Sequence, residues 1–173
     1  MPAELRLFLS AEQIQQRIEE MGAQIASDYP NGNLYLIGIL KGACIFLSDL
    51  CRAIPVNTRI EFIGTTSYGR GKTTSGEVKL SKDLDVSIEN EDVILVEDIV
   101  DSGVTLTYLM QVLWQRKPRS IRIATLLDKP QRRLRQVEAH YVGFQIPDEF
   151  VVGYGMDYAE DHRNLKDICI LSE

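Results

Sequence analysis

Two patterns of apolar residues run along this chain, and the first is the short continuous run. Three runs are prominent: LYLIGIL at 34–40, VILV at 93–96 and IRIATLL at 121–127. Runs of this length, bounded by turn residues, are typical of strands that are covered on both faces. Further strands are predicted at residues 59–68, 77–80, 141–146, 150–154 and 168–171.

The second pattern is helical spacing. Every third or fourth residue from Ile14 to Ile25 is apolar, and Ser10 with Gln13 predicts a capping box at the start of this helix. Two more helices are predicted, at residues 43–53 and from Gly103 towards Pro118. Strands and helices therefore alternate in the middle of the chain. This alternation predicts an α/β fold with a central parallel sheet flanked by helices.

The composition narrows the class of protein. The 173 residues suffice for one compact domain, and the sequence has no internal repeat, linker or second domain. A net charge of -6 argues against a nucleic acid as the main partner, because binding to a phosphate backbone needs a basic surface. The one basic cluster, Arg132-Arg133 with Arg135, is expected to be a solvated face.

The cysteines and the N-terminus indicate a cellular location. Cys44, Cys51 and Cys169 are odd in number and form no CxxC pattern, so we expect reduced, buried thiols. The N-terminal MPAELRLFLS is too short and too charged for a signal peptide, and no apolar run approaches membrane-spanning length. We therefore expect a cytoplasmic protein that binds no membrane.

The stretch VEDIVDSGVTL at 96–106 carries the clearest chemistry. It joins an apolar run to a predicted helix, so Glu97 and Asp98 are expected at the carboxyl end of a strand, where open α/β sheets bind ligands. The helix start at Ser102–Thr105 offers free N–H groups to a phosphate; Gly103 allows close approach and Thr105 adds a hydroxyl.

The three carboxylates of this stretch then need other targets. Glu97 and Asp98 suit the vicinal hydroxyls of a sugar, directly or through a bound Mg²⁺. Asp101, just before the phosphate cradle, suits a proton acceptor. Helix capping with solvated acids is the simpler alternative, but it explains one acid of this turn and not three.

Residues 93–105, VILVEDIVDSGVT, resemble the phosphoribosyl-pyrophosphate motif of type I phosphoribosyltransferases. The resemblance extends from about Leu34 to the C-terminus, and it implies one domain, residues 1–173, with the type I fold. A small hood would be assembled from the N- and C-terminal segments, and a mobile loop would span about 67–77. The matches that support the hypoxanthine-guanine branch of the family are LKG at 40–42, SYG at 67–69, LLDK at 126–129 and FVVGYGMDYAEDHRNL at 150–165.

The resemblance implies roles for the residues that bind phosphoribosyl pyrophosphate. Lys41-Gly42 would form a pyrophosphate loop, which in the family often has a cis peptide before the lysine, and Arg163 would bind the same group. A solvated lysine after a strand is the simpler alternative for Lys41. Ser67, Tyr68 and the loop after them resemble a lid that excludes water. The ribose phosphate would be bound by Glu97, Asp98, Asp101, Ser102, Gly103, Val104 and Thr105.

The resemblance also implies a purine site. Lys129 would donate to the 6-oxo group, Phe150 would stack on the ring, Val151 would offer backbone groups and Asp157 would lie beside the base. Without the resemblance, Phe150 would more often belong to the core. His162 is less suited to be the general base than Asp101, which already matches that role.

The implied reaction transfers the 5-phosphoribosyl group from phosphoribosyl pyrophosphate to N9 of hypoxanthine or guanine. It depends on Mg²⁺, with Glu97, Asp98 and Asp157 as the expected metal-associated acids, and it yields IMP or GMP and pyrophosphate. Two alternatives stay open: a nucleotide-sensing regulator on the same fold, and a phosphoribosyltransferase for xanthine or uracil. The acidic charge disfavours a regulator that binds nucleic acid. The resemblance also implies a homodimer or a homotetramer, since relatives are commonly dimers or tetramers.

Overall fold

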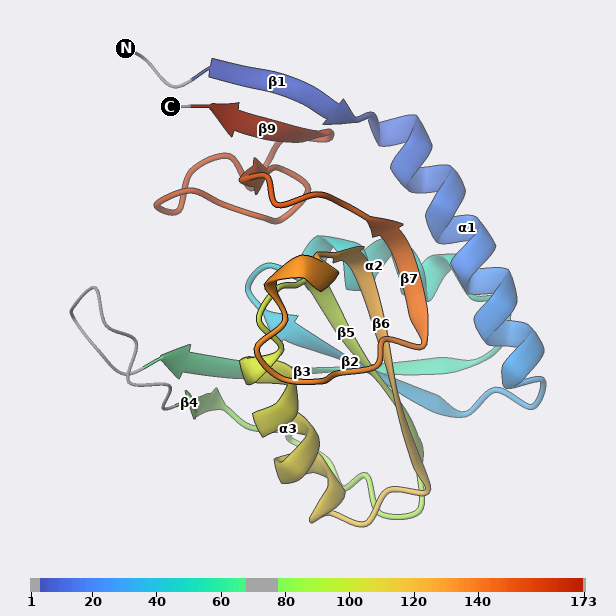
Figure 1. Cartoon of the computed structure of the whole chain (residues 1–173). Coiled ribbons are helices and arrows are strands. Elements are labelled where there is room, and N and C mark those ends of the chain that lie inside the picture. The colour runs from blue at the N-terminus through green and yellow to red at the C-terminus, as the bar shows by residue number, and fades with distance from the viewer. Residues whose placement is uncertain (1–3, 68–77, 173) are drawn as a thin grey trace.

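The computed structural model describes residues 4–67 and 78–172. Its main element is a six-stranded sheet of order β4-β3-β2-β5-β6-β7 (Figure 1). Five of the strands are parallel, and β4 joins one edge antiparallel to β3. The strands are β2 (Leu34–Leu40), β3 (Thr58–Ser67), β4 (Val78–Lys82), β5 (Asp92–Val100), β6 (Ser120–Asp128) and β7 (Tyr141–Gln145).

Three helices cover the two faces of this sheet: α1 (Ala11–Asp28), α2 (Cys44–Ala53) and α3 (Val104–Trp114). Successive residues of β2 and β5 point to opposite faces. Leu34 and Leu36 pack with α1 and α2, whereas Ile37 and Ile39 pack with the leucines of α3. Both faces are therefore buried, which is why these strands read as continuous apolar runs. The expected α/β fold with a mostly parallel central sheet is confirmed.

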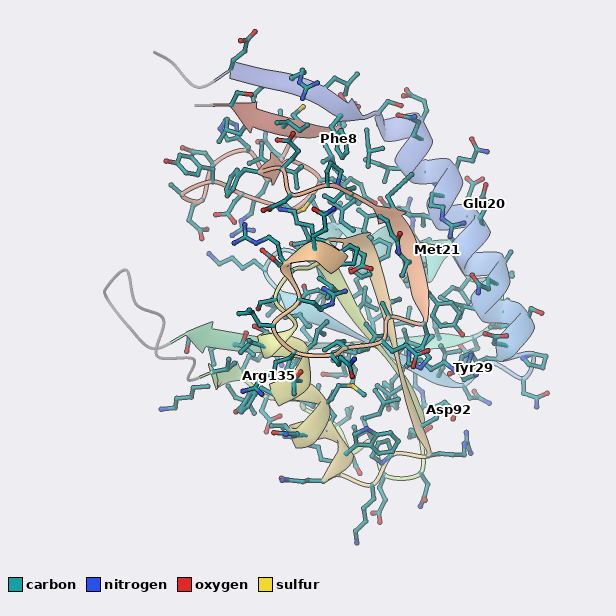
Figure 2. All side chains as sticks on the ribbon, viewed as in Figure 1. Phe8, Glu20, Met21, Tyr29, Asp92 and Arg135 are labelled. Carbon is teal, nitrogen blue, oxygen red and sulfur yellow. The ribbon has the colours of Figure 1, made fainter. Side chains whose placement is uncertain are left out.

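The first helix shows how local sequence and packing agree. The Ser10 hydroxyl accepts from the Gln13 N–H, and the Gln13 side chain accepts from the Ser10 N–H, so the predicted capping box is confirmed. Figure 2 shows Met21 on the side of α1 that faces the sheet and Glu20 on the opposite side. Met21 is buried and Glu20 is exposed, as the helical spacing predicts.

A second, three-stranded sheet joins the two ends of the described chain. It has the order β1-β9-β8, with β1 (Glu4–Leu9), β8 (Val151–Val152) and β9 (Ile168–Ser172). Strand β1, which the sequence did not predict, pairs antiparallel with β9 (Figure 1). Leu5 and Leu7 stay exposed on it, so the segment lacks the buried apolar run by which the other strands were found.

Several predicted details differ from the structure. Strand β5 does not end at Val96 but continues to Val100, because its pairing with β6 extends to Val100 and Asp128. Strand β8 is only two residues long, because turns follow it. The three cysteines are free, but none is buried: Cys44 is exposed and the other two are partly exposed, so the prediction of buried thiols is wrong.

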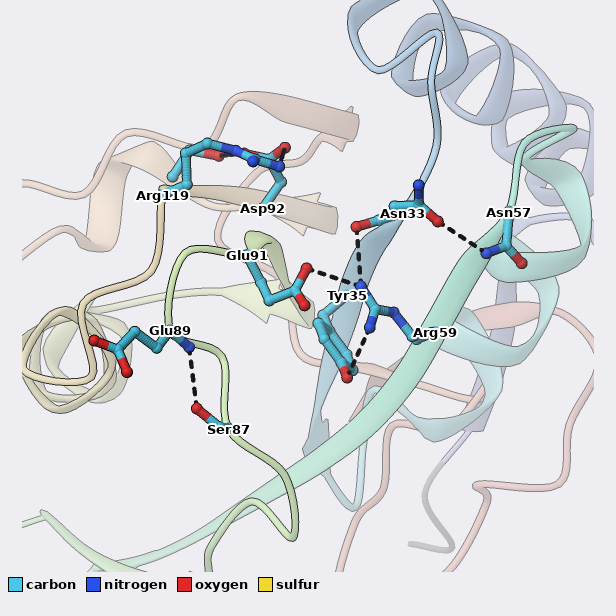
Figure 3. A network of polar contacts seen from close by, with 10 residues as sticks. Asn33, Tyr35, Asn57, Arg59, Ser87, Glu89, Glu91, Asp92 and Arg119 are labelled. Atoms are coloured by element: carbon cyan, nitrogen blue, oxygen red, sulfur yellow. Dashed lines mark hydrogen bonds and ion pairs between the residues drawn. The ribbon is translucent and has the colours of Figure 1, made fainter.

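The amino ends of the parallel strands are closed by a polar network (Figure 3). Arg59 donates to the Glu91 carboxylate at 2.8 Å and to the Tyr35 hydroxyl at 3.2 Å, and its guanidinium lies 4.1 Å from the centre of the Tyr35 ring. Arg119 pairs with Asp92 at 2.6 Å. These four charges are paired within the protein, whereas, among the described residues, adjacent acids at the opposite, carboxyl ends of the strands are not. No described helix is long and apolar enough to cross a membrane.

Candidate active site

The site lies where the chain changes direction in the sheet. Strands β2 and β5 are neighbours, but β2 leads to β3 on one side and β5 leads to β6 on the other. The connections after β2 and β5 therefore diverge, and they leave a crevice at the carboxyl ends of these strands. The loop Lys41-Gly42 follows β2, and Glu97 and Asp98 lie near the end of β5.

Glu97 and Asp98 are paired acids with little access to water. The Glu97 carboxylate accepts from the Asp98 N–H at 3.0 Å, and the Asp98 carboxylate accepts from the Ile99 N–H at 2.7 Å. Burial raises the pKa of the Glu97 carboxyl well above its usual value, and the Asp98 carboxylate beside it raises that pKa further. Burial also raises the pKa of Asp98. Within residues 4–67 and 78–172 neither carboxylate forms an ion pair within 4 Å, although the charge of Arg163 acts on Asp98. Such a pair suits a site that receives a hydroxyl donor or a cation.

This arrangement predicts that Glu97→Gln stabilises the ligand-free protein at neutral pH. A protein loses stability when a carboxyl with a raised pKa in the folded state must ionise. The loss grows as the pH rises from the ordinary pKa of 4.5 through the folded-state pKa. The substitution should therefore raise the free energy of unfolding at pH 7. The gain should shrink towards pH 4.5. Urea unfolding in chelator between pH 4.5 and 8 measures it. Glu89→Gln, at an exposed position, serves as the control, and an equal gain at every pH would contradict the prediction.

Glycines bring the loop after β2 against these acids. A Cβ on Gly42 would lie 1.9 Å from the Asp98 carboxylate oxygen, and a Cβ on Gly155 would lie 2.4 Å from the Gly42 carbonyl oxygen. Three segments therefore meet without space for a side chain: the β2 loop, the end of β5 and the segment after β8. The peptide bond between Leu40 and Lys41 is cis.

The turn after β5 forms a small cavity lined by Glu97, Asp101, Ser102, Gly103 and Thr105, among others. Gly103 adopts a left-handed backbone with φ 80°, a conformation that glycine adopts without strain, and α3 begins directly after it. The Val104 N–H donates to the Ser102 hydroxyl at 3.3 Å. Within residues 4–67 and 78–172, the N–H groups of Ser102, Gly103 and Thr105 have no hydrogen-bond acceptor. The predicted N–H cradle thus has donors available for an anion.

A second cavity, of about 340 Å³, adjoins the first. Asp101 and Ile99 line both cavities. Lys129 is 5% exposed, and its ammonium lies 3.9 Å from the Asp148 carboxylate. Phe150 is 52% exposed and meets Tyr158 edge-to-face, so it is not a core residue. The second cavity is lined by Asp98, Ile99, Asp101, Lys129, Arg132, Phe150, Val151, Met156 and Asp157.

Cations of the site are held by acids from the segment after β8. Lys41 pairs with Glu160 at 2.8 Å, and Arg163 pairs with Asp157 at 3.0 Å and with Glu160 at 3.2 Å. Arg163 also donates to the Gly155 carbonyl at 2.8 Å. The structure therefore links Lys41, Asp157 and Arg163, and Glu160, which the sequence did not single out, connects the two cations.

Two predicted site residues, Ser67 and Tyr68, lie at the boundary of the described residues. Ser67 is the last residue of β3, and Tyr68 and the rest of the predicted mobile loop to residue 77 lie outside the described residues. His162 has a positive φ of 75°, and its carbonyl accepts from the Leu165 N–H, so it contributes to a backbone turn.

In the basic cluster at 132–135, Arg132 and Arg135 are exposed, as expected, but Arg133 is largely buried and pairs within the protein. The Arg133 guanidinium pairs with Asp128 and donates to the carbonyl oxygens of Val100 and Asp101, at 3.0 and 2.8 Å. Arg132 pairs with Asp101 at 3.1 Å and with Asp148 at 3.1 Å. The turn Pro130–Arg132 brings these side chains back onto the end of β5, which no local pattern in the sequence could indicate.

The carboxylates of the site fit Mg²⁺ only together with ligands from a substrate. Among the described residues, no three His, Cys, Asp or Glu side chains converge to hold a metal by themselves. Mg²⁺ in enzymes that act on phosphates is commonly bound by one or two carboxylates, with substrate oxygens and water as the other ligands. The buried Glu97, the half-buried Asp98 beside it and Asp157 at the second cavity fit that kind of donor set.

Comparison with known proteins agrees with this geometry. A model of the phosphoribosyl transferase domain matches residues 8–159. A hypoxanthine-guanine phosphoribosyltransferase of Bacillus subtilis is 47% identical over 166 residues, covering 96% of this chain and 92% of its own length. One from Mycobacterium tuberculosis is 51% identical over 171 residues, covering 95% and 85%. The crystal structure of a Bacillus anthracis hypoxanthine-guanine phosphoribosyltransferase superposes with a TM-score of 0.93 at 46% identity, covering 98% of this chain and all of that chain.

Proposed function

Since this chain belongs to the hypoxanthine-guanine phosphoribosyltransferase family, we propose that its two adjoining cavities bind the two substrates of one reaction. The chain is a purine-salvage transferase, which moves a phosphoribosyl group from phosphoribosyl pyrophosphate to a purine base. The observation that carries the assignment of the cavities is their shared wall. Asp101 lines both, so a group at this residue faces the sugar phosphate on one side and the base on the other.

The first cavity is the proposed ribose phosphate site. The N–H groups of the turn from Ser102 to Thr105 hold the 5′-phosphate, and the hydroxyl of Thr105 adds a donor. Glu97 and Asp98 accept hydrogen bonds from the ribose hydroxyls. Lys41, Gly42 and Arg163 bind the pyrophosphate, for which Lys41 and Arg163 must leave Glu160. The Arg163 guanidinium can bind two phosphate oxygens at once, and this interaction is stronger than its exposed ion pair with Glu160.

The second cavity is the proposed purine site. Phe150 offers an exposed ring face for stacking, and its exposure supports a role in binding rather than in the core. Lys129 donates to the 6-oxo oxygen, and Val151 offers backbone groups to the edge of the base. Asp101 accepts the N7 proton while N9 bonds to C1′ and the bond from C1′ to pyrophosphate breaks.

Mg²⁺, when bound to the substrate beside Glu97, Asp98 and Asp157, supplies charge neutralisation for the leaving pyrophosphate. The residues of the chain do the rest: they orient the sugar, hold the base in line and accept its proton. A dimeric or tetrameric assembly and a cytoplasmic location stay predictions.

Lys129 gives the base assignment a direct test. Lys129→Met removes the donor to the 6-oxo group, so kcat/KM for hypoxanthine should fall roughly tenfold, the value of one charge-assisted hydrogen bond. The preference for hypoxanthine over adenine should narrow, because the donor that repels an amino group is lost. Steady-state assays with both bases measure this. Lys117→Met, at an exposed position beyond α3, is the control. An unchanged ratio between the two bases would place the 6-oxo group elsewhere.

A further inference from the structure

The carbonyl groups of residues 100–103, which lead into the turn with the free N–H groups, all accept hydrogen bonds from other parts of the protein. The Val100 carbonyl accepts from the Lys129 N–H at 2.9 Å and from Arg133 at 3.0 Å, and the Asp101 carbonyl accepts from Arg133 at 2.8 Å. The Ser102 carbonyl accepts from the N–H groups of residues 134 and 135, and the Gly103 carbonyl accepts from Thr107. Four consecutive carbonyls thus have partners outside the cavity.

The geometry of the peptide bond makes this arrangement functional. In a trans peptide the C=O of one residue and the N–H of the next point in opposite directions in one plane. Fixing the Asp101 and Ser102 carbonyls on one side therefore directs the N–H groups of Ser102 and Gly103 to the other. Those are the N–H groups that have no acceptor within the described residues and that belong to the first cavity.

Arg133 is built into the fold at the back of this turn. Its side chain is only 17% exposed, and it pairs with Asp128, whose side chain is also buried. One terminal nitrogen serves Asp128 and the other serves the two carbonyls, a combination that needs the planar fork of arginine. The backbone after Arg133 also packs closely against the turn, since a Cβ on Gly103 would lie 2.7 Å from the Arg135 carbonyl oxygen.

We propose that Arg133 is a positioning residue for the phosphate cradle. Its guanidinium holds the carbonyls of Val100 and Asp101 away from the ligand, so that the N–H groups of the turn face the 5′-phosphate. The inference rests on the proposed function, which places the 5′-phosphate in the first cavity. It assigns to Arg133 a main effect on the phosphate, because its side chain lines neither cavity and acts through the carbonyls of the turn that carries the free N–H groups.

The test compares the product nucleotide with its nucleoside. Kd values for IMP and inosine, measured by calorimetry or by competition, give a ratio that isolates the contribution of the 5′-phosphate. Arg133→Met should lower the ratio of Kd for inosine to Kd for IMP roughly tenfold, with little change in the Kd for inosine. Arg133→Lys keeps a cation beside Asp128 but cannot serve both carbonyls, so it should lose less. Arg135→Met, at an exposed neighbouring position, should leave the ratio unchanged.

The possible outcomes distinguish a failure of the positioning role from a failure of the proposed phosphate site. If the wild-type protein binds IMP no better than inosine, the assignment of the phosphate site fails. If the wild type prefers IMP and both Arg133 variants keep that preference, the positioning role is overturned. A parallel loss of both affinities with a lowered Tm indicates a merely structural role and overturns it as well. If Arg133→Met does not fold, Arg133→Lys decides by the same ratio.

Discussion

Replacing Asp101 by Asn is expected to lower kcat for nucleotide formation by a hundredfold or more, with little effect on the KM for phosphoribosyl pyrophosphate. Asp101 lines both cavities, so it adjoins both the proposed ribose phosphate site and the proposed purine site. A positioned general base contributes about 10²–10⁴ in rate. Asparagine has nearly the same shape and can accept a hydrogen bond, but it cannot take the proton from N7. Single-turnover assays with hypoxanthine measure the chemical step.

The control for this substitution removes the other carboxylate that pairs with Arg132 and leaves Asp101 in place. Arg132 pairs with Asp101 and Asp148 at the same distance, so Asp148→Asn disturbs the same arginine from its other side. Asp148 also lies 3.9 Å from the Lys129 ammonium, so its loss should act mainly on the KM for hypoxanthine. We expect kcat of Asp148→Asn to stay within a few-fold of the wild-type value, because its pair with Arg132 is exposed. A kcat for Asp101→Asn equal to that of Asp148→Asn would remove Asp101 as the proton acceptor.

The substitution Gly42→Ala should lower kcat/KM a hundredfold or more. The added Cβ would lie 1.9 Å from the Asp98 carboxylate oxygen, so either this carboxylate or the pyrophosphate loop must move. A displacement of about 1 Å at a reacting site can cost a hundredfold in rate. Gly42 has no positive φ, so alanine is not strained there and the effect comes from the contact alone.

A matched glycine lies at the other end of the sheet. A Cβ on Gly32 would lie 2.9 Å from the Asn57 carbonyl oxygen, and Gly32 has φ 63°. Gly32→Ala should therefore lower Tm but leave kcat/KM nearly unchanged. Gly42→Ala should lower kcat/KM but leave Tm nearly unchanged. Thermal unfolding and steady-state assays on both variants measure the two effects, and full activity of Gly42→Ala would show that Asp98 needs no fixed position.

The fold was largely predictable because burial leaves a pattern in the sequence. The runs at 34–40 and 93–96 are apolar throughout because helices cover both faces of the sheet, and Ser10 with Gln13 marked the start of α1 correctly. Strand β1 was missed because half of its apolar residues stay exposed. The end of β5 was placed too early, since its pairing with β6 carries the strand through the two acids.

The candidate site was predictable where one local segment carries it. The acids and the N–H cradle of residues 97–105 lie next to one another in the sequence and line adjoining cavities in the structure. The contacts of Arg133 with Val100 and Asp101 were not predictable, because they depend on how a turn more than thirty residues later folds back on this segment. The same holds for Glu160, which meets Lys41 across 119 positions.

The most direct test is nucleotide formation by the purified protein. The protein is incubated with phosphoribosyl pyrophosphate, Mg²⁺ and, in separate reactions, hypoxanthine, guanine, xanthine or adenine, and the nucleotide product is measured. We predict IMP from hypoxanthine or GMP from guanine, released together with pyrophosphate, and far less nucleotide from adenine. The absence of product with every 6-oxopurine would contradict the proposed reaction.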